Sequence, residues 1–261
     1  MSHYTYLAKF NQMADTCYQN QNYFANNVWE AILLVSSNAV LLPVTWRAMS
    51  HGYKTRAYLS FAAFTASVCY HLCIIAPLFG ESCVLHFCAL KLLDYTPSYT
   101  ILITGPLLLV PFNAFYRKED LDKPKTIIKP DFTFVDDWII FSCAIYVAVV
   151  VGEINGFGPL TWLQLAIPLI FVILVVIFSW VHIYVVFKRK PTFDIPDLIA
   201  VAVLSVFGIF MFLIEYVLNP TSYWATHSLW HLLGGLAYLY LIEARNKKRS
   251  GFWALFPSHQ E

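Results

Sequence analysis

Charged residues are scarce in this 261-residue chain: Asp, Glu, Lys and Arg together make up 13% of it, against 59% for hydrophobic residues. A soluble globular protein carries about 25% charged residues. The 17 Lys and Arg balance 16 Asp and Glu, so no surplus of cations exists to neutralise the phosphates of a nucleic acid. The same composition excludes a disordered chain. We therefore expect a membrane protein that has no nucleic acid as a partner.

Several other features are missing as well. No Gly-, Ser- or Pro-rich run divides the chain into two domains, and no Cys-x-x-Cys pair points to a thiolate zinc cluster. Residues 1–27 are polar and lack the apolar core of a cleavable signal peptide, so we expect the first span to drive insertion. Cys69 and Cys73 lie in an apolar run and are expected to be small packing residues. Cys17 and Cys83 could pair outside the cell.

Seven apolar windows are long enough, or nearly so, to cross a hydrocarbon layer of about 30 Å. They predict an all-α membrane protein, a seven-transmembrane helix bundle over residues 28–243 followed by a tail over residues 244–261. The windows lie at about residues 28–46, 57–79, 86–115, 137–152, 159–187, 196–218 and 223–243.

The positions of the cations predict the orientation of the bundle. Fifteen of the 17 Lys and Arg fall in the segments after the first, third, fifth and seventh windows, which leaves only Lys9 and Lys91 for the other side. By the positive-inside rule, the N-terminus is outside and the C-terminus is cytoplasmic. Residues 1–27 would then be an extracellular segment and residues 244–261 a cytoplasmic tail.

Few polar residues lie within the windows, and each is a candidate site because an ionisable group is costly inside a bilayer. The second window holds Ser67 and His71, the third holds Asp94, and the seventh holds His227 and His231. Residues four apart lie on one helix face, and the predicted orientation places all five in the outer part of the bilayer. The three histidines could supply three zinc ligands and leave a fourth position for water. Asp94 would act as a general base or hydrogen-bonding partner, and Ser67 as a donor.

Simpler interpretations of the same residues stay open at this point. Asp94 could pair with Lys91 three residues earlier, and Ser67 could donate to the carbonyl of residue 63. His227 could be a solvated residue at the membrane surface. Glu215, near the outer end of the sixth window, could line the same cavity as the histidines or reach the lipid headgroups.

The five positions together resemble the CREST superfamily of seven-span proteins, which includes alkaline ceramidases and adipoQ-type receptors. The shared pattern is Ser-x3-His in the second span, Asp in the third and His-x3-His in the seventh. Within the superfamily, the chain is most similar to the myomaker family of the transmembrane-protein-8 branch. The similar stretches include Leu41-Leu42-Pro43, Arg56-Ala57-Tyr58-Leu59, Leu93-Asp94-Tyr95 and His227-Ser228-Leu229-Trp230-His231. The polar N-terminal extension and a tail without cysteines depart from that family.

The resemblance implies a plasma-membrane protein, with the Golgi as a second location, that promotes cell–cell fusion such as the fusion of myoblasts. It also implies Zn²⁺ as cofactor, membrane lipids as partners, a homodimer and a fusion cofactor protein. A second function stays open, that of a zinc-dependent intramembrane lipid hydrolase similar to the ceramidases. His71, His227 and His231 would then hold a catalytic zinc, Asp94 would accept the proton of water and Ser67 would stabilise the oxyanion. Whether the zinc is structural or catalytic is undecided by the sequence.

Overall fold

The computed structural model describes residues 27–76, 87–110, 132–156, 159–187, 193–217 and 223–245. Within these ranges every regular element is a helix, which confirms the predicted all-α class. The described parts of all seven apolar windows form helices of the structure. The N-terminal segment, Cys17, Cys83 and the tail after residue 245 lie outside the described residues, so the expectations for them stay predictions.

The first apolar window forms α2 (Val28–Ser36), a 3₁₀ turn η1 (Ser37–Val40) and α3 (Leu41–Ser50). Asn27 caps α2, because its side-chain oxygen accepts hydrogen bonds from the backbone N–H groups of Trp29 and Glu30. The η1 turn brings Val40 against α10 at Gly235, where a Cβ atom would lie 2.4 Å from Val40 Cγ1. The glycine therefore permits this close approach of the first span to α10.

The remaining windows form longer helices. They are α4 (Lys54–Ile75), α5 (Phe87–Thr104) with the 3₁₀ turn η3 (Gly105–Leu109), α7 (Phe132–Val149) with the π-helical turn η5 (Val150–Ile154), α8 (Trp162–Phe187), α9 (Ile195–Val217) and α10 (Tyr223–Arg245).

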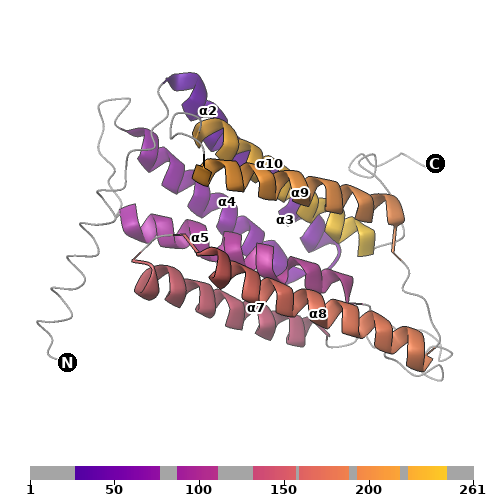
Figure 1. The fold of residues 1–261 in the computed structure, drawn as a ribbon. Helices are drawn as coiled ribbons and strands as arrows, with labels where there is room; N and C mark the ends of the chain where they lie inside the picture. Colours follow the sequence, from indigo (N-terminus) through magenta and orange to yellow (C-terminus); the bar gives the residue numbers. More distant parts are fainter. Residues whose placement is uncertain are drawn as a thin grey trace, which may run out of the picture.

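The helices run side by side along one direction, with α4 and α5 in the middle of the bundle (Figure 1). On one side, α10 packs against α9, α2, η1 and α3, and α3 also packs against α4. On the other side, α7 and α8 pack against α5. The two groups are joined mainly through the contact of α4 with α5. Although α8 and α9 are consecutive in the sequence, α8 packs on α5 and η3 whereas α9 packs on α10.

Five helical stretches in the described ranges are long and apolar enough to cross a bilayer. They are Val28–Ser50, Lys54–Ile75, Asp136–Ile154, Leu163–Val186 and Ile195–Ile214. Large apolar side chains are exposed on them, including Phe178 and Leu163 of α8, 79% and 72% exposed. Soluble proteins rarely expose such large apolar surfaces to water, so this exposure indicates a protein embedded in a membrane. The helices α5 and α10 are not among the five, and they carry the buried charged and polar side chains Lys91, Asp94, His227 and Glu243.

The cysteines differ in part from the expectation. Cys69 and Cys143 are free thiols, but Cys73, at the end of α4, and Cys88, at the start of α5, are disulfide-bonded. The prediction that Cys73 only fills space was therefore wrong. An apolar neighbourhood does not distinguish a packing cysteine from a bonded one, because Cys73 and Cys88 also contact the apolar cluster of Tyr70, Ile74 and Phe87.

Candidate metal centre and polar networks

Three histidines from two helices meet inside the bundle. The Nε2 atom of His71, on α4, lies 3.4 Å from Nε2 of His231, on α10, which in turn lies 3.0 Å from Nε2 of His227. The three possible ligand atoms all lie within 4.8 Å of one another. His71 is fully buried, His227 is buried and His231 is half-buried. The structure thus brings together the three histidines that the sequence singled out.

Local structure accounts for this convergence. His227 and His231 lie one helical turn apart on α10, so their rings pack edge to face with centroids 4.6 Å apart. Tyr223, one turn before His227, stacks on its ring at 4.6 Å with an interplanar angle of 23°. On α4, the ring of Tyr70 contacts that of His71 at 5.2 Å. Aromatic neighbours therefore restrict the rotation of two of the three imidazoles.

Ser67 and Asp94 lie beside the histidines. Ser67 is fully buried on α4, one turn before His71, and Asp94 is 2% exposed on α5. The Asp94 carboxylate is within hydrogen-bonding range of the Ser67 hydroxyl, and it is close enough to His227 for an electrostatic interaction. Neither Ser67 Oγ nor Asp94 Oδ1 has a hydrogen-bond partner of good geometry among the described residues. The simpler interpretations fail here, since Asp94 forms no ion pair with Lys91 and Ser67 does not donate to the carbonyl of residue 63.

Two more buried polar atoms on α4 and α10 have no hydrogen-bond partner among the described residues. His71 Nδ1 is buried without one, and so is the hydroxyl of Ser228, a residue that sequence reasoning missed. Buried polar atoms in proteins are nearly always hydrogen-bonded, to protein or to ordered water. Unpartnered buried atoms of this kind therefore favour a site that takes up water or an ion.

The donor set suits a metal ion. In a tetrahedral zinc site with Zn–N distances of about 2.0–2.1 Å, two ligand nitrogens lie about 3.3 Å apart. The observed 3.0 and 3.4 Å separations are close to this value. Three converging Nε2 atoms cannot satisfy one another by hydrogen bonds alone, because each pair needs one N–H and one lone pair. A cation at their centre would accept all three lone pairs, so His71, His227 and His231 could hold a metal ion.

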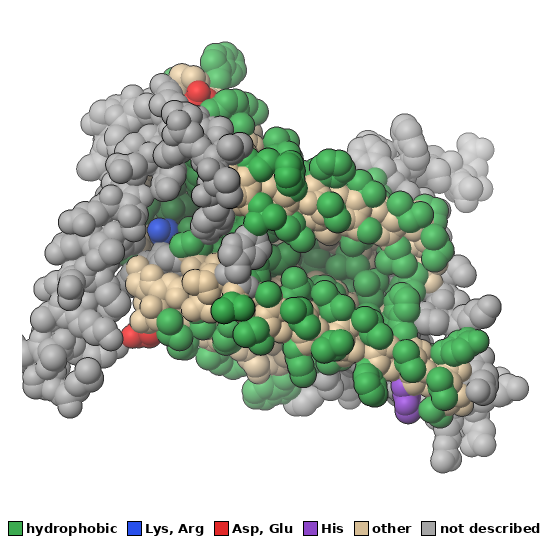
Figure 2. Space-filling model, viewed as in Figure 1, with side chains coloured by type: hydrophobic (Ala, Val, Ile, Leu, Met, Phe, Trp, Pro, Cys, Tyr) green, Lys and Arg blue, Asp and Glu red, His purple; other side chains and the backbone are tan. Residues whose placement is uncertain are grey.

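A cavity of about 290 Å³ begins at His231 and extends into the bundle. Apolar side chains of α5, α8, α9 and α10 form most of its wall, and Ser98, Ser205 and Tyr238 add hydroxyl groups. The cavity-lining residues of α10 run from Trp230 to Leu241, so the cavity spans about 16 Å along that helix. Figure 2 shows a hollow with hydrophobic walls between the two groups of helices on this face. The side chain of Glu215 lies outside the described residues, and its predicted place in the cavity stays a prediction.

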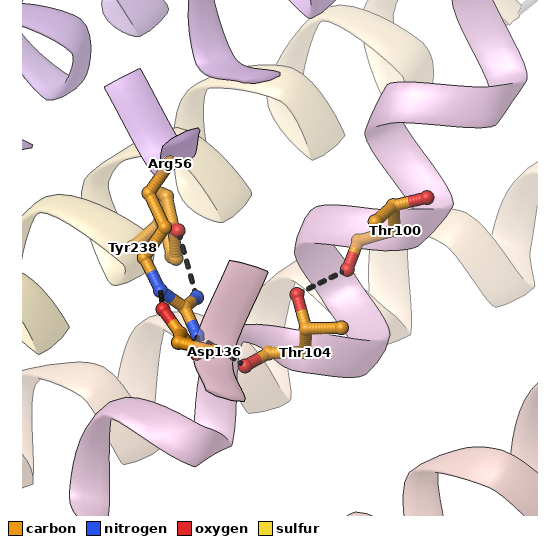
Figure 3. A network of polar contacts seen from close by, with 5 residues as sticks. All are labelled: Arg56, Thr100, Thr104, Asp136 and Tyr238. Carbon is orange, nitrogen blue, oxygen red and sulfur yellow. Dashed lines mark hydrogen bonds and ion pairs between the residues drawn. The ribbon is translucent and has the colours of Figure 1, made fainter. Parts of the chain in front are cut away.

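The opposite end of the cavity adjoins a buried ion pair that sequence reasoning missed. Arg56, 1% exposed on α4, binds Asp136 of α7 through two hydrogen bonds of 2.7 and 2.5 Å. Its guanidinium also donates to the hydroxyl of Tyr238 at 3.1 Å and to the backbone carbonyl of Thr104 at 3.2 Å. Figure 3 shows these contacts, with Thr104 donating in turn to the carbonyl of Thr100. The network joins four helical segments: α4, α7, α10 and the end of α5.

A second ion pair lies at the same end of the bundle. Arg47 of α3 forms a two-point ion pair with Glu243 of α10, and His51 lies 3.6 Å from the same carboxylate. The sequence prediction treated Arg47 and Arg56 as cations of a loop. Both instead lie on helices. Each is paired with a carboxylate that is distant in the sequence, and this pairing allows Arg56 to be buried.

No family model matches the chain, and no curated protein sequence matches it at a significant level.

Proposed function

We propose that the protein crosses the membrane seven times, with the histidine cluster near the exoplasmic side. The five apolar stretches would surround α5 and α10, whose polar side chains are sheltered from lipid. Two observations support the orientation. Arg47, Arg56 and Lys54 lie at the end opposite the histidines, where the positive-inside rule expects cations. The disulfide-bonded Cys73 and Cys88 lie at the histidine end, and disulfides form in oxidising compartments such as the cell exterior.

We further propose that the histidine cluster holds Zn²⁺. Three imidazoles, with no thiolate nearby, form a donor set that zinc accepts readily. A zinc ion held there would connect α4 to α10 at their outer ends and act as a Lewis acid on whatever oxygen it meets. Elemental analysis of the purified protein should find about one zinc per chain, and the His227→Ala/His231→Ala variant should lose it.

The proposed cellular role is the promotion of cell–cell fusion at the plasma membrane, as in myoblasts. The observation that carries this proposal is the convergence of Ser67, His71, Asp94, His227 and His231, the five positions that produced the resemblance to the myomaker family. This convergence supports the resemblance, because five polar residues from three helices that shared no site would not be expected to lie together at one depth. Membrane lipids, a second copy of the chain and a fusion cofactor protein are the partners that this role implies.

Cell mixing tests the fusion role. Fibroblasts that express the chain at the surface are mixed with fusion-competent myoblasts, and shared cytoplasm is scored with two fluorescent labels. We expect fusion with the wild type and a loss of it with the His227→Ala/His231→Ala variant. His182→Ala, an exposed histidine on α8, is the matched control and should fuse normally. Surface-expressed wild-type protein that yields no more shared cytoplasm than empty vector would overturn the proposal.

Hydrolysis of a lipid amide or ester is the second candidate, and the buried Ser67 and Asp94 beside the histidines favour it. A structural zinc site needs neither group. In a hydrolase, Asp94 would accept a proton from the attacking water, and Ser67 would donate a hydrogen bond to the developing oxyanion. Asp94→Asn and Ser67→Ala should then abolish lipid turnover by the purified protein while leaving it folded. If the purified protein turns over no lipid and both variants still fuse cells, the hydrolase function is excluded.

A further inference from the structure

Lys91 is a buried cation for which the described part of the chain supplies no anion. Its side chain lies near the start of α5 and is only 9% exposed. The ion pairs of the described residues are Arg47–Glu243 and Arg56–Asp136, with His51 close to Glu243, and none involves Lys91. Its one recorded contact is with the ring of Tyr95, 5.8 Å from the ammonium nitrogen. A buried ammonium group without an anion is costly, so a ligand from outside the chain is the natural source of compensation.

The position of Lys91 relates it to the histidine cluster and to the cavity. Lys91, Asp94, Ser98 and Gly105 follow one another at spacings of three, four and seven residues, which places them on one face of α5 and η3. Ser98 and Gly105 line the cavity, and Asp94 lies beside His227. Lys91 is about 4.5 Å further along the helix than Asp94, toward the start of α5. From that end inward, this face presents the Lys91 cation, then Asp94 beside the histidines of α4 and α10, and then the apolar cavity.

This order matches the chemistry of a membrane phospholipid. Its headgroup carries a phosphate anion, short polar ester linkages follow, and the acyl chains are apolar. Lysine binds phosphate as a compact point charge with three N–H donors. We propose that the Lys91 ammonium binds the phosphate of a phospholipid headgroup at the outer end of the bundle. Lys91 is thus a specificity residue that favours phosphate-bearing lipids over lipids that lack phosphate.

The inference extends the proposed function, because it names the lipid class that meets the histidine site. Binding of the phosphate itself requires neither zinc nor fusion. The two proposals can therefore fail separately: the His227→Ala/His231→Ala variant should lose zinc and still prefer phosphate-bearing lipids.

The test uses the full-length protein in a phosphate-free, uncharged detergent and follows its thermal unfolding as lipid is added. The probes are a short-chain phosphatidylcholine, a diacylglycerol with the same acyl chains, and inorganic phosphate. Phosphatidylcholine should raise the unfolding temperature of the wild type at much lower concentration than either other probe. Lys91→Met and Lys91→Gln should weaken phosphatidylcholine binding about tenfold or more, whereas Lys91→Arg should retain it. Lys54→Met, an exposed lysine at the other end of the bundle, should bind as the wild type does.

Three outcomes would overturn the inference. One is a wild type that binds diacylglycerol as tightly as phosphatidylcholine, a result that needs no variant to fold. Another is a wild type that binds inorganic phosphate as tightly as phosphatidylcholine, because the site would then recognise phosphate and not a phospholipid. The third is unchanged phosphatidylcholine binding by folded Lys91→Met and Lys91→Gln proteins.

Discussion

Removal of the Asp136 carboxylate should be one of the most destabilising single changes in the described part of the chain. Arg56 is 1% exposed, and Asp136 accepts two of the four hydrogen bonds that its guanidinium donates. In Asp136→Leu the buried cation keeps only two neutral acceptors, Tyr238 and the Thr104 carbonyl. Breaking a buried ion pair from one side costs about 3–5 kcal/mol, because the remaining charge is uncompensated. Replacing both partners, as in Arg56→Met/Asp136→Leu, removes that charge and should cost far less.

Thermal unfolding of the purified protein, followed by circular dichroism, measures this difference. At about 2–4 °C per kcal/mol for a chain of this size, each single variant should unfold about 6–20 °C below the wild type. The double variant should unfold within a few degrees of the wild type. Tyr238→Phe removes one hydrogen bond to a charged group and should cost about 1.5–3 kcal/mol. The reasoning is refuted if the double variant is as unstable as the singles, or if Asp136→Leu unfolds with the wild type.

Other expectations concern packing and pH. Gly235→Ala should destabilise the protein by about 1–3 kcal/mol, because the added Cβ overlaps Val40, whereas Gly234→Ala meets nothing closer than Trp230 at 3.9 Å and should be tolerated. Val40→Ala should rescue Gly235→Ala in the same unfolding assay. His51 lies in the turn between α3 and α4, where burial and the nearby Arg47 lower its pKa below 6.5 despite the opposing effect of Glu243. The fold therefore favours the neutral form of His51. The stability that this preference contributes is complete above about pH 6.5 and declines as the pH falls. His51→Gln should therefore reduce the drop in unfolding temperature between pH 7.5 and pH 5.5.

The positions of the helices could be predicted from the sequence because a bilayer requires about 20 apolar residues for each crossing. Even α5 and α10 were found, although they are less apolar than the other helices. The meeting of His71 with His231, 160 residues apart, was also predictable. Two histidines four residues apart define a helix face, and the cation pattern sets the depth of each span.

The buried pairs at the other end were not predictable in the same way. Arg56 meets Asp136 across 80 residues and Tyr238 across 182, and no local spacing marks either partner. A cation in the first turn of an apolar helix has the same sequence signature whether it faces water or a carboxylate on another helix. The disulfide bonding of Cys73 escaped for a related reason, since burial and apolar neighbours are common to free and bonded cysteines.

Polar contacts at both ends explain how α4, α5 and α10 stay together in a bilayer. Lipid is as apolar as the side chains, so helices in a membrane gain little from hydrophobic burial against one another and depend on packing and polar contacts. These three helices meet at the histidine cluster and again at the Arg56 network, about 22 Å away along α4. The Arg56 network needs no metal, and it already fixes the register of α4 against α10. The histidines are therefore held near one another before any ion binds. Removal of a bound metal by a chelator should lower the unfolding temperature and leave the helices folded.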